Sequence, residues 1–204
     1  LLDGKFYIDK NRMLKNLNKY KVILASNSPR RKELLSGLGV DYEVRTLPDI
    51  KETYPGDLKA GNIPLYIARE KAEAYRGIIN PDELIITADT IVWLDGEVLG
   101  KPIDREDALR MLRSLSGRTH QVFTGVCLTT TGWQRSFIAA TEVRFAELSE
   151  EEITYYVDRY LPMDKAGSYG VQEWIGYIAV ENISGSYFNI MGLPIQRLYQ
   201  ELKK

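Results

Sequence analysis

The sequence has 204 residues, a formal net charge of −1, one cysteine and one histidine. A chain of this length buries enough apolar surface to fold without disulfides. Its single cysteine, Cys127, excludes an internal disulfide and a cysteine-rich zinc site. The lack of an excess of basic residues argues against nucleic acid as its partner. No apolar run is long enough to span a bilayer and no signal-peptide core is present, so we expect a cytoplasmic protein that does not bind membranes.

Strands and helices alternate in the first half of the sequence. Short apolar runs predict buried strands, and Ser28 followed by Pro29 is typical of the start of a helix. We expect residues 1–20 to form an extension before a single domain at residues 21–204, and Asp89 to follow the carboxyl end of its strand. The predicted elements are strands at 21–25, 42–45 and 84–88, helices at 30–38 and 62–79, a loop at 48–61 and a hairpin at 90–99 that turns at Asp95 and Gly96.

The second half is predicted to contain long paired strands. Phe137, Val143 and Phe145 fall on one face of an extended segment, and Ser149 with Glu152 has the spacing of a capping box. The predicted elements are a helix from Asp104 to Leu115, strands at 120–130 and 135–148, a helix from Ser149 to Tyr160, a loop at 162–176, a strand at 177–181 and a helix that begins at Pro194. These patterns predict a mixed α/β protein with a cleft between two lobes.

The start of the first helix carries an unusual concentration of positive charge. Arg30, Arg31 and Lys32 occupy its first turn, where the helix dipole already favours anions. Together with the hydroxyl groups of Ser26 and Ser28, these cations suit a bound phosphate group. A solvated basic turn with a serine cap is the alternative interpretation.

Two further positions could serve the same ligand. Asp89 could bind Mg²⁺ or act as a general base on water, and it could equally be an ordinary turn residue. Lys101 lies between Gly100 and Pro102, which restricts its backbone, although it could be a simple surface lysine. Glu52 is another carboxylate, and its position in the predicted loop leads us to expect it on the surface.

The segment from Asp164 to Gln172 combines charge, glycine and an amide. Gly167 and Gly170 permit close approach of the backbone to a ligand, Lys165 adds a cation, and Gln172 offers both a donor and an acceptor for the edge of a nucleobase. A structural loop is the alternative. The lone His120 and Cys127 are both interpreted as structural residues.

These segments together resemble the Maf family, whose members are nucleoside triphosphate pyrophosphatases first named as septum-formation inhibitors. The resemblance covers residues 21–202 and rests on Ser26-Asn27-Ser28-Pro29-Arg30-Arg31, Ala88-Asp89-Thr90, Gly100-Lys101-Pro102, Thr124-Gly125, Asp164 to Gln172, Gly185-Ser186-Tyr187 and Gly192-Leu193-Pro194. It implies an α/β fold with an elongated mixed sheet flanked by helices and a central cleft, similar to that of inosine triphosphate pyrophosphatases. It also implies a divalent metal cofactor, Mg²⁺ or Mn²⁺, and a homodimer.

The resemblance also implies roles for individual residues. Asp89 matches the proton acceptor of the family, and Arg30, Thr90 and Gln172 match the specificity residues of the subgroup that acts on dTTP and UTP. The 7-methyl-GTP subgroup has glutamine in place of Thr90. Our hypothesis assigns the phosphates to Ser26, Arg30, Arg31, Lys71, Lys101 and Lys165, and the metal to Glu52 and Asp89.

Two alternatives remain open at this point. One is a pyrophosphatase for 7-methyl-GTP or another modified purine nucleotide, and the other is a nucleotide-binding regulator of cell division. Many members of the family have glycine after the glutamine, whereas Gln172 is here followed by Glu173 and Trp174. This difference bears on the base pocket and hence on base preference.

Overall fold

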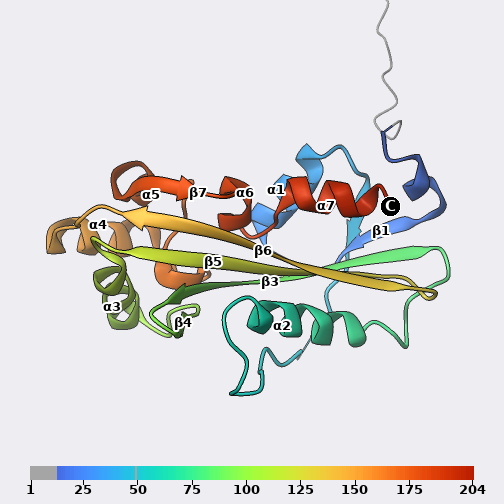
Figure 1. Cartoon of the computed structure of the whole chain (residues 1–204), viewed down its shortest axis with the longest axis horizontal. Helices are drawn as coiled ribbons and strands as arrows, with labels where there is room; N and C mark the ends of the chain where they lie inside the picture. Colours follow the sequence, from blue (N-terminus) through green and yellow to red (C-terminus); the bar gives the residue numbers. More distant parts are fainter. Residues whose placement is uncertain (1–12, 49) are drawn as a thin grey trace, which may run out of the picture.

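A computed structural model describes residues 13–48 and 50–204 and contains one seven-stranded mixed sheet, flanked by helices (Figure 1). The strands are β1 (Lys21–Leu24), β2 (Tyr42–Val44), β3 (Glu83–Leu94), β4 (Glu97–Leu99), β5 (Thr119–Thr129), β6 (Gln134–Phe145) and β7 (Val180–Ser184). The helices are η2 (Lys15–Lys19), α1 (Pro29–Gly37), α2 (Asn62–Glu73), α3 (Arg105–Leu115), α4 (Glu150–Tyr160), η3 (Ala166–Ser168), α5 (Trp174–Ala179), α6 (Tyr187–Ile190) and α7 (Ile195–Leu202).

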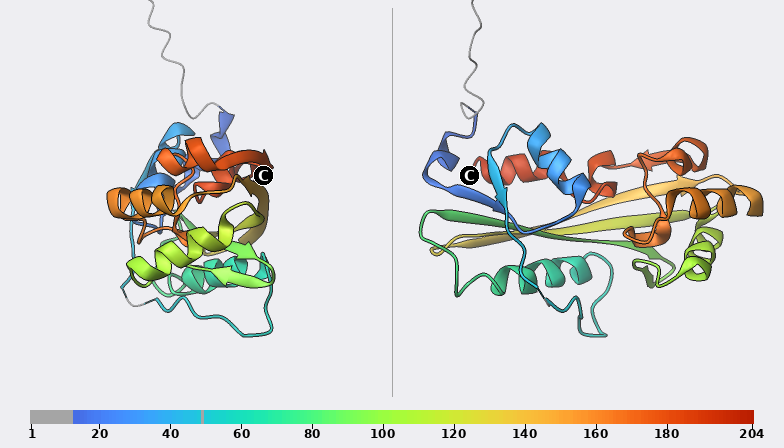
Figure 2. Two further views of the ribbon diagram at one scale, coloured as in Figure 1. Left: turned by 90° about the vertical axis from the view of Figure 1, so that its left-hand side faces the viewer. Right: turned by 180° about the vertical axis from the view of Figure 1, so that it is seen from behind.

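The order of the strands is β2-β1-β3-β5-β6-β7, and β4 pairs separately with β3. The pairs β2–β1 and β1–β3 are parallel, whereas β3–β5, β5–β6 and β6–β7 are antiparallel. Helix α2 lies on one side of the sheet, and α1, α6 and α7 lie on the other (Figures 1 and 2). This arrangement confirms the predicted α/β class with an elongated mixed sheet.

One edge of β3 changes its partner along its length. Residues up to Ile86 pair with β1, and residues from Val92 onward pair with β4. Between these two positions that edge pairs with no strand in the described part of the chain, while the other edge of β3 stays bonded to β5. The interruption lies between a half that contains β1, β2 and α1 and a half that contains β4, α3 and α4 (Figure 1).

Three predicted helix starts and one predicted turn are confirmed. The Ser28 hydroxyl caps α1, Asp104 caps α3, and Ser149 with Glu152 forms the complete capping box of α4. The turn between β3 and β4 has positive φ angles at Asp95 and Gly96, as expected for a tight hairpin.

Three predicted boundaries of strands and helices were wrong. Asp89 lies inside β3 rather than after its end, because β5 continues to pair with β3 as far as Trp93. Helix α2 ends at Glu73 rather than at residue 79. The predicted strand at 177–181 is displaced, because Tyr177 belongs to α5 and β7 starts at Val180.

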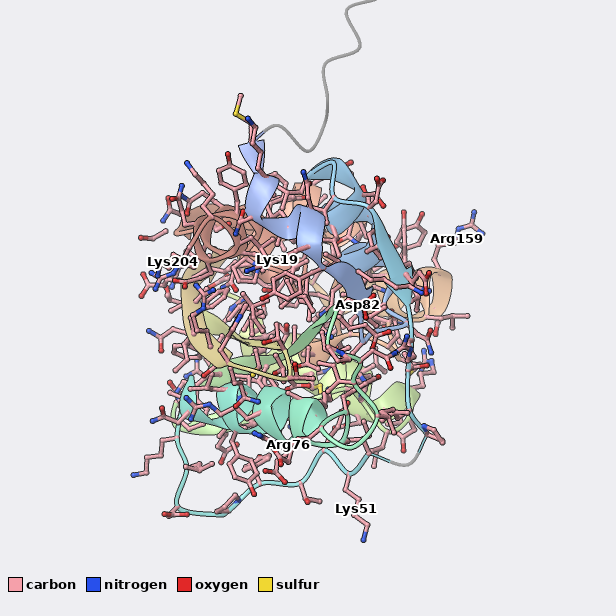
Figure 3. The ribbon with its side chains drawn as sticks, turned by 90° about the vertical axis from the view of Figure 1, so that its right-hand side faces the viewer. Lys19, Lys51, Arg76, Asp82, Arg159 and Lys204 are labelled. Carbon is pink, nitrogen blue, oxygen red and sulfur yellow. The ribbon has the colours of Figure 1, made fainter. Side chains whose placement is uncertain are left out.

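The main core lies between the sheet and the helices that cover it. It includes Leu14 and Leu17, which belong to the segment expected to precede the domain; residues 1–12 of that segment lie outside the described residues. Charged side chains such as those of Lys51 and Arg159 point away from the ribbon (Figure 3). Within residues 13–48 and 50–204, no helix has the length and apolarity needed to cross a membrane.

Candidate active site

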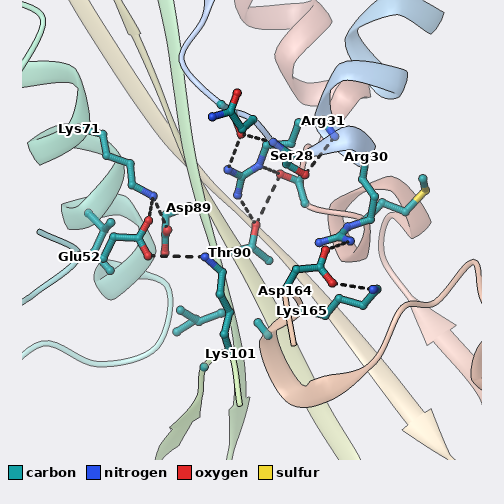
Figure 4. A pocket seen from close by; sticks show the side chains of 18 of the residues that line it. Ser28, Arg30, Arg31, Glu52, Lys71, Asp89, Thr90, Lys101, Asp164 and Lys165 are labelled. Carbon is teal, nitrogen blue, oxygen red and sulfur yellow. Dashed lines mark hydrogen bonds and ion pairs between the residues drawn. The ribbon is translucent and has the colours of Figure 1, made fainter. Parts of the chain in front are cut away.

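A cleft of about 850 Å³ lies at the interruption in the edge of β3. The turn from β1 into α1 forms one side of it, and the residues that follow β4 and α4 form the other (Figure 4). All ten residues predicted for the site line this single cleft, and they are Ser26, Arg30, Arg31, Glu52, Lys71, Asp89, Thr90, Lys101, Lys165 and Gln172. The structure therefore brings together positions that are up to 146 residues apart in the sequence, although their individual roles stay predictions.

Asp89 and Thr90 are successive residues of β3, so their side chains point to opposite faces of the sheet. The Asp89 carboxylate faces α2, which lies on that side and contributes Lys71. The Thr90 hydroxyl faces the other side, where its oxygen lies 2.9 Å from the Thr124 hydroxyl. The open edge of β3 makes both faces accessible from one cleft.

A charged cluster surrounds Asp89. The Lys71 ammonium lies 2.8 Å from Asp89 Oδ1 and 2.7 Å from Glu52 Oε1, and the Lys101 ammonium lies 4.0 Å from the other oxygen of Glu52 (Figure 4). Burial raises the pKa of Asp89, although Lys71 opposes this effect. Partial burial acts in the same direction on Glu52, but its hydrogen bond and charge interaction with Lys71 leave the pKa of Glu52 below its usual value.

Arg31 is held by three acceptors at once. Its Nε donates to the Gly192 carbonyl at 2.8 Å, and its two terminal nitrogens donate to Thr90 Oγ1 at 3.2 Å and to Ser26 Oγ at 3.4 Å. Burial lowers the pKa of Arg31, an effect that the charge of Asp89 opposes. Because an arginine stays protonated in proteins, this network fixes a positive charge at the start of α1.

A second charged cluster lies on the opposite wall of the cleft. Asp164 accepts a hydrogen bond from Arg30 at 2.8 Å and one from Lys165 at 2.7 Å. The Lys165 ammonium also lies 3.2 Å from Glu173, whose other oxygen accepts a hydrogen bond from the Tyr156 hydroxyl. Lys165 is buried, so its two carboxylate neighbours compensate the loss of water around its charge.

Gln172 supplies a polar group with no partner. Its Oε1 is buried and has no hydrogen-bond partner among the described residues, although the residue lines the cleft. A buried acceptor without a donor is unfavourable, so a ligand that donates a hydrogen bond here would satisfy it.

Two carboxylates in the cleft are donors of the kind that a divalent cation prefers. Glu52 and Asp89 both direct an oxygen at the Lys71 ammonium, so their carboxylates converge on one point where a positive charge lies. Mg²⁺ is commonly held by one or two carboxylates and by substrate phosphates. Among residues 13–48 and 50–204, no group of three or more histidine, cysteine or acidic side chains suited to a metal occurs.

Sequence reasoning gave no role to Asp164, Glu173 or Tyr156. Asp164 stands beside Lys165 in a motif that was used for the resemblance, and that adjacency was the available signal. Glu173 was noted only as a departure from the family. Tyr156 lies among the buried residues of α4, where the sequence pattern does not distinguish it from a core residue.

Five cationic and three acidic side chains line the cleft, a composition suited to a small polyanion. The family model described as Maf-like protein matches residues 21–204, and the chain belongs to this family.

Two relatives of high sequence identity support the same relationship. A dTTP/UTP pyrophosphatase of Bacteroides thetaiotaomicron is 74% identical to this chain, and the match covers 94% of this chain and 100% of the relative. A dTTP/UTP pyrophosphatase of Phocaeicola vulgatus has the same identity and coverage. Among solved structures, a HAM1 protein from Coxiella burnetii aligns with 90% of this chain and 98% of its own, at a TM-score of 0.47 and 13% identity.

Proposed function

We propose that this protein hydrolyses dTTP and UTP, and modified pyrimidine nucleotides of the same kind, to the nucleoside monophosphate and pyrophosphate. The identity to relatives named dTTP/UTP pyrophosphatase supports this proposal. The observation in the structure that carries it is the position of Asp89, which is buried at the open edge of β3 and surrounded by lysine and arginine side chains.

In the proposed reaction, water attacks the α-phosphorus and the bond from that phosphorus to the bridging oxygen breaks, so that pyrophosphate leaves. Asp89 accepts the proton of the attacking water. Burial, which raises the pKa of Asp89, makes this carboxylate a stronger base. The Lys71 ammonium, 2.8 Å away, favours the ionised carboxylate, which is the form that accepts a proton.

The remaining cations bind and orient the triphosphate. Arg30 and Arg31 stand on the first turn of α1, Lys71 stands on α2, and Lys101 and Lys165 come from the other half of the fold. Ser26 adds a hydroxyl beside Arg31. Because folding fixes these groups before substrate arrives, they stabilise developing negative charge with little further reorganisation.

A divalent metal ion is part of the proposal. Glu52 and Asp89 would hold Mg²⁺ or Mn²⁺, which would neutralise charge on the phosphate oxygens. The charge balance of the cleft supports a bound metal ion, since five cationic and three acidic side chains line the cleft. Their excess of two positive charges is smaller than the negative charge of a triphosphate, and a divalent cation would supply further positive charge.

Arg30, Thr90 and Gln172 are proposed to select the base. Thymine and uracil carry an imide N–H that is a donor, and Gln172 Oε1 is an acceptor without a partner among the described residues. Thr90 lines the cleft, and the position of its hydroxyl is fixed by hydrogen bonds with Arg31 and Thr124. We further propose that the reaction takes place in the cytoplasm and that the enzyme is a homodimer, which light scattering of the purified chain would test.

The test is pyrophosphate release from dTTP, UTP, CTP, GTP and 7-methyl-GTP, each with Mg²⁺ and with a chelator. We expect dTTP and UTP to be the best substrates and the chelator to abolish turnover. Asp89→Asn should lower kcat about 10²- to 10⁴-fold, which is the usual contribution of a general base, and should still bind nucleotide.

Other outcomes discriminate the alternatives. A preference for 7-methyl-GTP would overturn only the choice of base and would indicate a modified-purine pyrophosphatase. Binding without turnover of any nucleotide would indicate a nucleotide-binding regulator of division instead of an enzyme.

A further inference from the structure

Asp164 has both carboxylate oxygens engaged by cations that we assign to the substrate. Its Oδ2 accepts from Arg30 at 2.8 Å, and its Oδ1 accepts from Lys165 at 2.7 Å. Figure 4 shows the carboxylate between these two side chains, in the cleft. A phosphate group engages two neighbouring cations in the same way, through two of its oxygens.

The contact joins the two sides of the cleft. Arg30 is in the first turn of α1, whereas Asp164 lies in the turn between α4 and η3. The carboxylate therefore lies where a polyphosphate bound by both Arg30 and Lys165 would have to lie.

Asp164 is poorly suited to a purely structural role. Its side chain is 55% exposed, so water can hydrate the carboxylate when it leaves the two cations. The Lys165 ammonium keeps a second carboxylate neighbour when Asp164 moves away, because Glu173 lies 3.2 Å from it and is itself only 21% exposed. The pairing of Asp164 is thus weak enough to be displaced by a ligand.

We propose that Asp164 is an affinity-determining residue that occupies Arg30 and Lys165 in the resting site and competes with phosphate groups for them. The proposal rests on the function proposed above. A triphosphate displaces the carboxylate when it binds, and the carboxylate returns to the two cations when pyrophosphate leaves. Asp164 thereby weakens the binding of every polyphosphate, and it weakens retention of the product in particular.

The test compares inorganic pyrophosphate binding to the wild-type chain and to Asp164→Asn by titration calorimetry in a magnesium-free buffer. The variant keeps the size of the side chain and removes its charge. Because the ion pairs of Asp164 with Arg30 and Lys165 no longer have to be broken, we expect pyrophosphate to bind roughly tenfold more tightly. In steady-state assays with dTTP, KM and the inhibition constant of pyrophosphate should fall by a similar factor.

Asp158→Asn is the matched control. Asp158 is also a half-exposed acid paired with an arginine, at 2.6 Å from Arg105, but it does not line the cleft. It should leave pyrophosphate affinity unchanged, which separates the effect of Asp164 from that of the net charge. If Asp164→Asn fails to fold, Asp164→Ser removes the same charge and should give the same tightening.

Unchanged or weaker pyrophosphate binding in the Asp164 variants would overturn the proposal, because the carboxylate would then not compete for the cations. The calorimetric result does not depend on turnover. A chain that hydrolyses no nucleotide would refute the proposed function, whereas the pyrophosphate affinities would still decide the role of Asp164.

Discussion

The Lys71 ammonium joins two carboxylates that lie on different segments, at 2.8 Å from Asp89 and 2.7 Å from Glu52. The Lys71 and Asp89 side chains are only 13% and 12% exposed. Lys71 keeps Glu52 as a second carboxylate partner, whereas removal of Lys71 would leave the buried Asp89 carboxylate without the cation it contacts.

This relationship predicts the effect of Lys71→Met. The variant loses the cation that favours the ionised form of Asp89 and a contact to the substrate, so we expect kcat/KM for dTTP to fall about 10²-fold or more. Pyrophosphate release under steady-state conditions measures the change. Arg76→Met, which removes an exposed cation just beyond α2, is the control and should keep its activity. A Lys71 variant as active as this control would contradict the proposed role.

Arg31→Lys tests the guanidinium network. A lysine cannot reach Gly192, Thr90 and Ser26 together, since it lacks the rigid fork of arginine. We expect KM for dTTP to rise about tenfold, corresponding to about 1.4 kcal/mol of lost binding. Arg110→Lys, at an exposed pair on α3, should have no effect. Equal KM values for the two variants would show that charge alone suffices at Arg31.

Gly125→Ala tests how closely α2 approaches the sheet. A Cβ atom at this position would lie 2.3 Å from the backbone nitrogen of Leu65, and neither backbone can move without repacking. We expect the free energy of unfolding to decrease by about 3 kcal/mol, measured by urea denaturation. Gly132→Ala is the control, because a Cβ atom there would meet nothing within 4 Å. Similar stabilities for both variants would mean that α2 shifts freely.

The pH dependence of stability is predicted from His120. Its imidazole is buried, lies 2.8 Å from the Tyr169 hydroxyl through Nε2 and is packed against Phe145. Burial lowers the pKa of His120 from 6.5 to about 4. As the pH falls from 6.5 to 4, the unfolded chain therefore takes up a proton that the folded chain does not.

This difference should destabilise the fold progressively across that window, by about 3 kcal/mol at its lower end. Urea denaturation at pH 7 and pH 4.5 measures the loss. His120→Gln cannot titrate, so it should lose less stability than the wild-type chain between the two pH values. Identical losses would show that His120 does not contribute.

Local signals predicted most of the elements correctly. The capping box at Ser149, the turn at Asp95 and Gly96 and the apolar face of β6 depend on residues close together in the sequence. The length of β3 was not predictable in this way. A polar pair, Asp89 and Thr90, interrupts its apolar pattern, and only the pairing with β5 shows that the strand continues.

The site illustrates the same limit. The sequence predicted ten of the residues that line the cleft, but their pairings depend on tertiary structure. Arg30 meets Asp164 across 134 positions of the sequence, and no local pattern predicts that contact. Nothing in the sequence around Tyr156 indicates that its hydroxyl donates to Glu173 and accepts from the Gly170 N–H.

The continuity of the long strands has a consequence for motion. Strands β3, β5 and β6 contain 12, 11 and 12 residues, and their hydrogen bonds run past the cleft from one half of the fold to the other. These hydrogen bonds connect the half that contains β1 and α1 with the half that contains β4 and α3, so a hinge motion between the two halves would have to break them. Adjustment to a ligand falls to the loops that carry Glu52 and Asp164, whereas Arg31, Lys71 and Asp89 stand on regular elements. Binding and release of a nucleotide would then depend on small movements of these two acidic loops, while the sheet and its helices keep their positions.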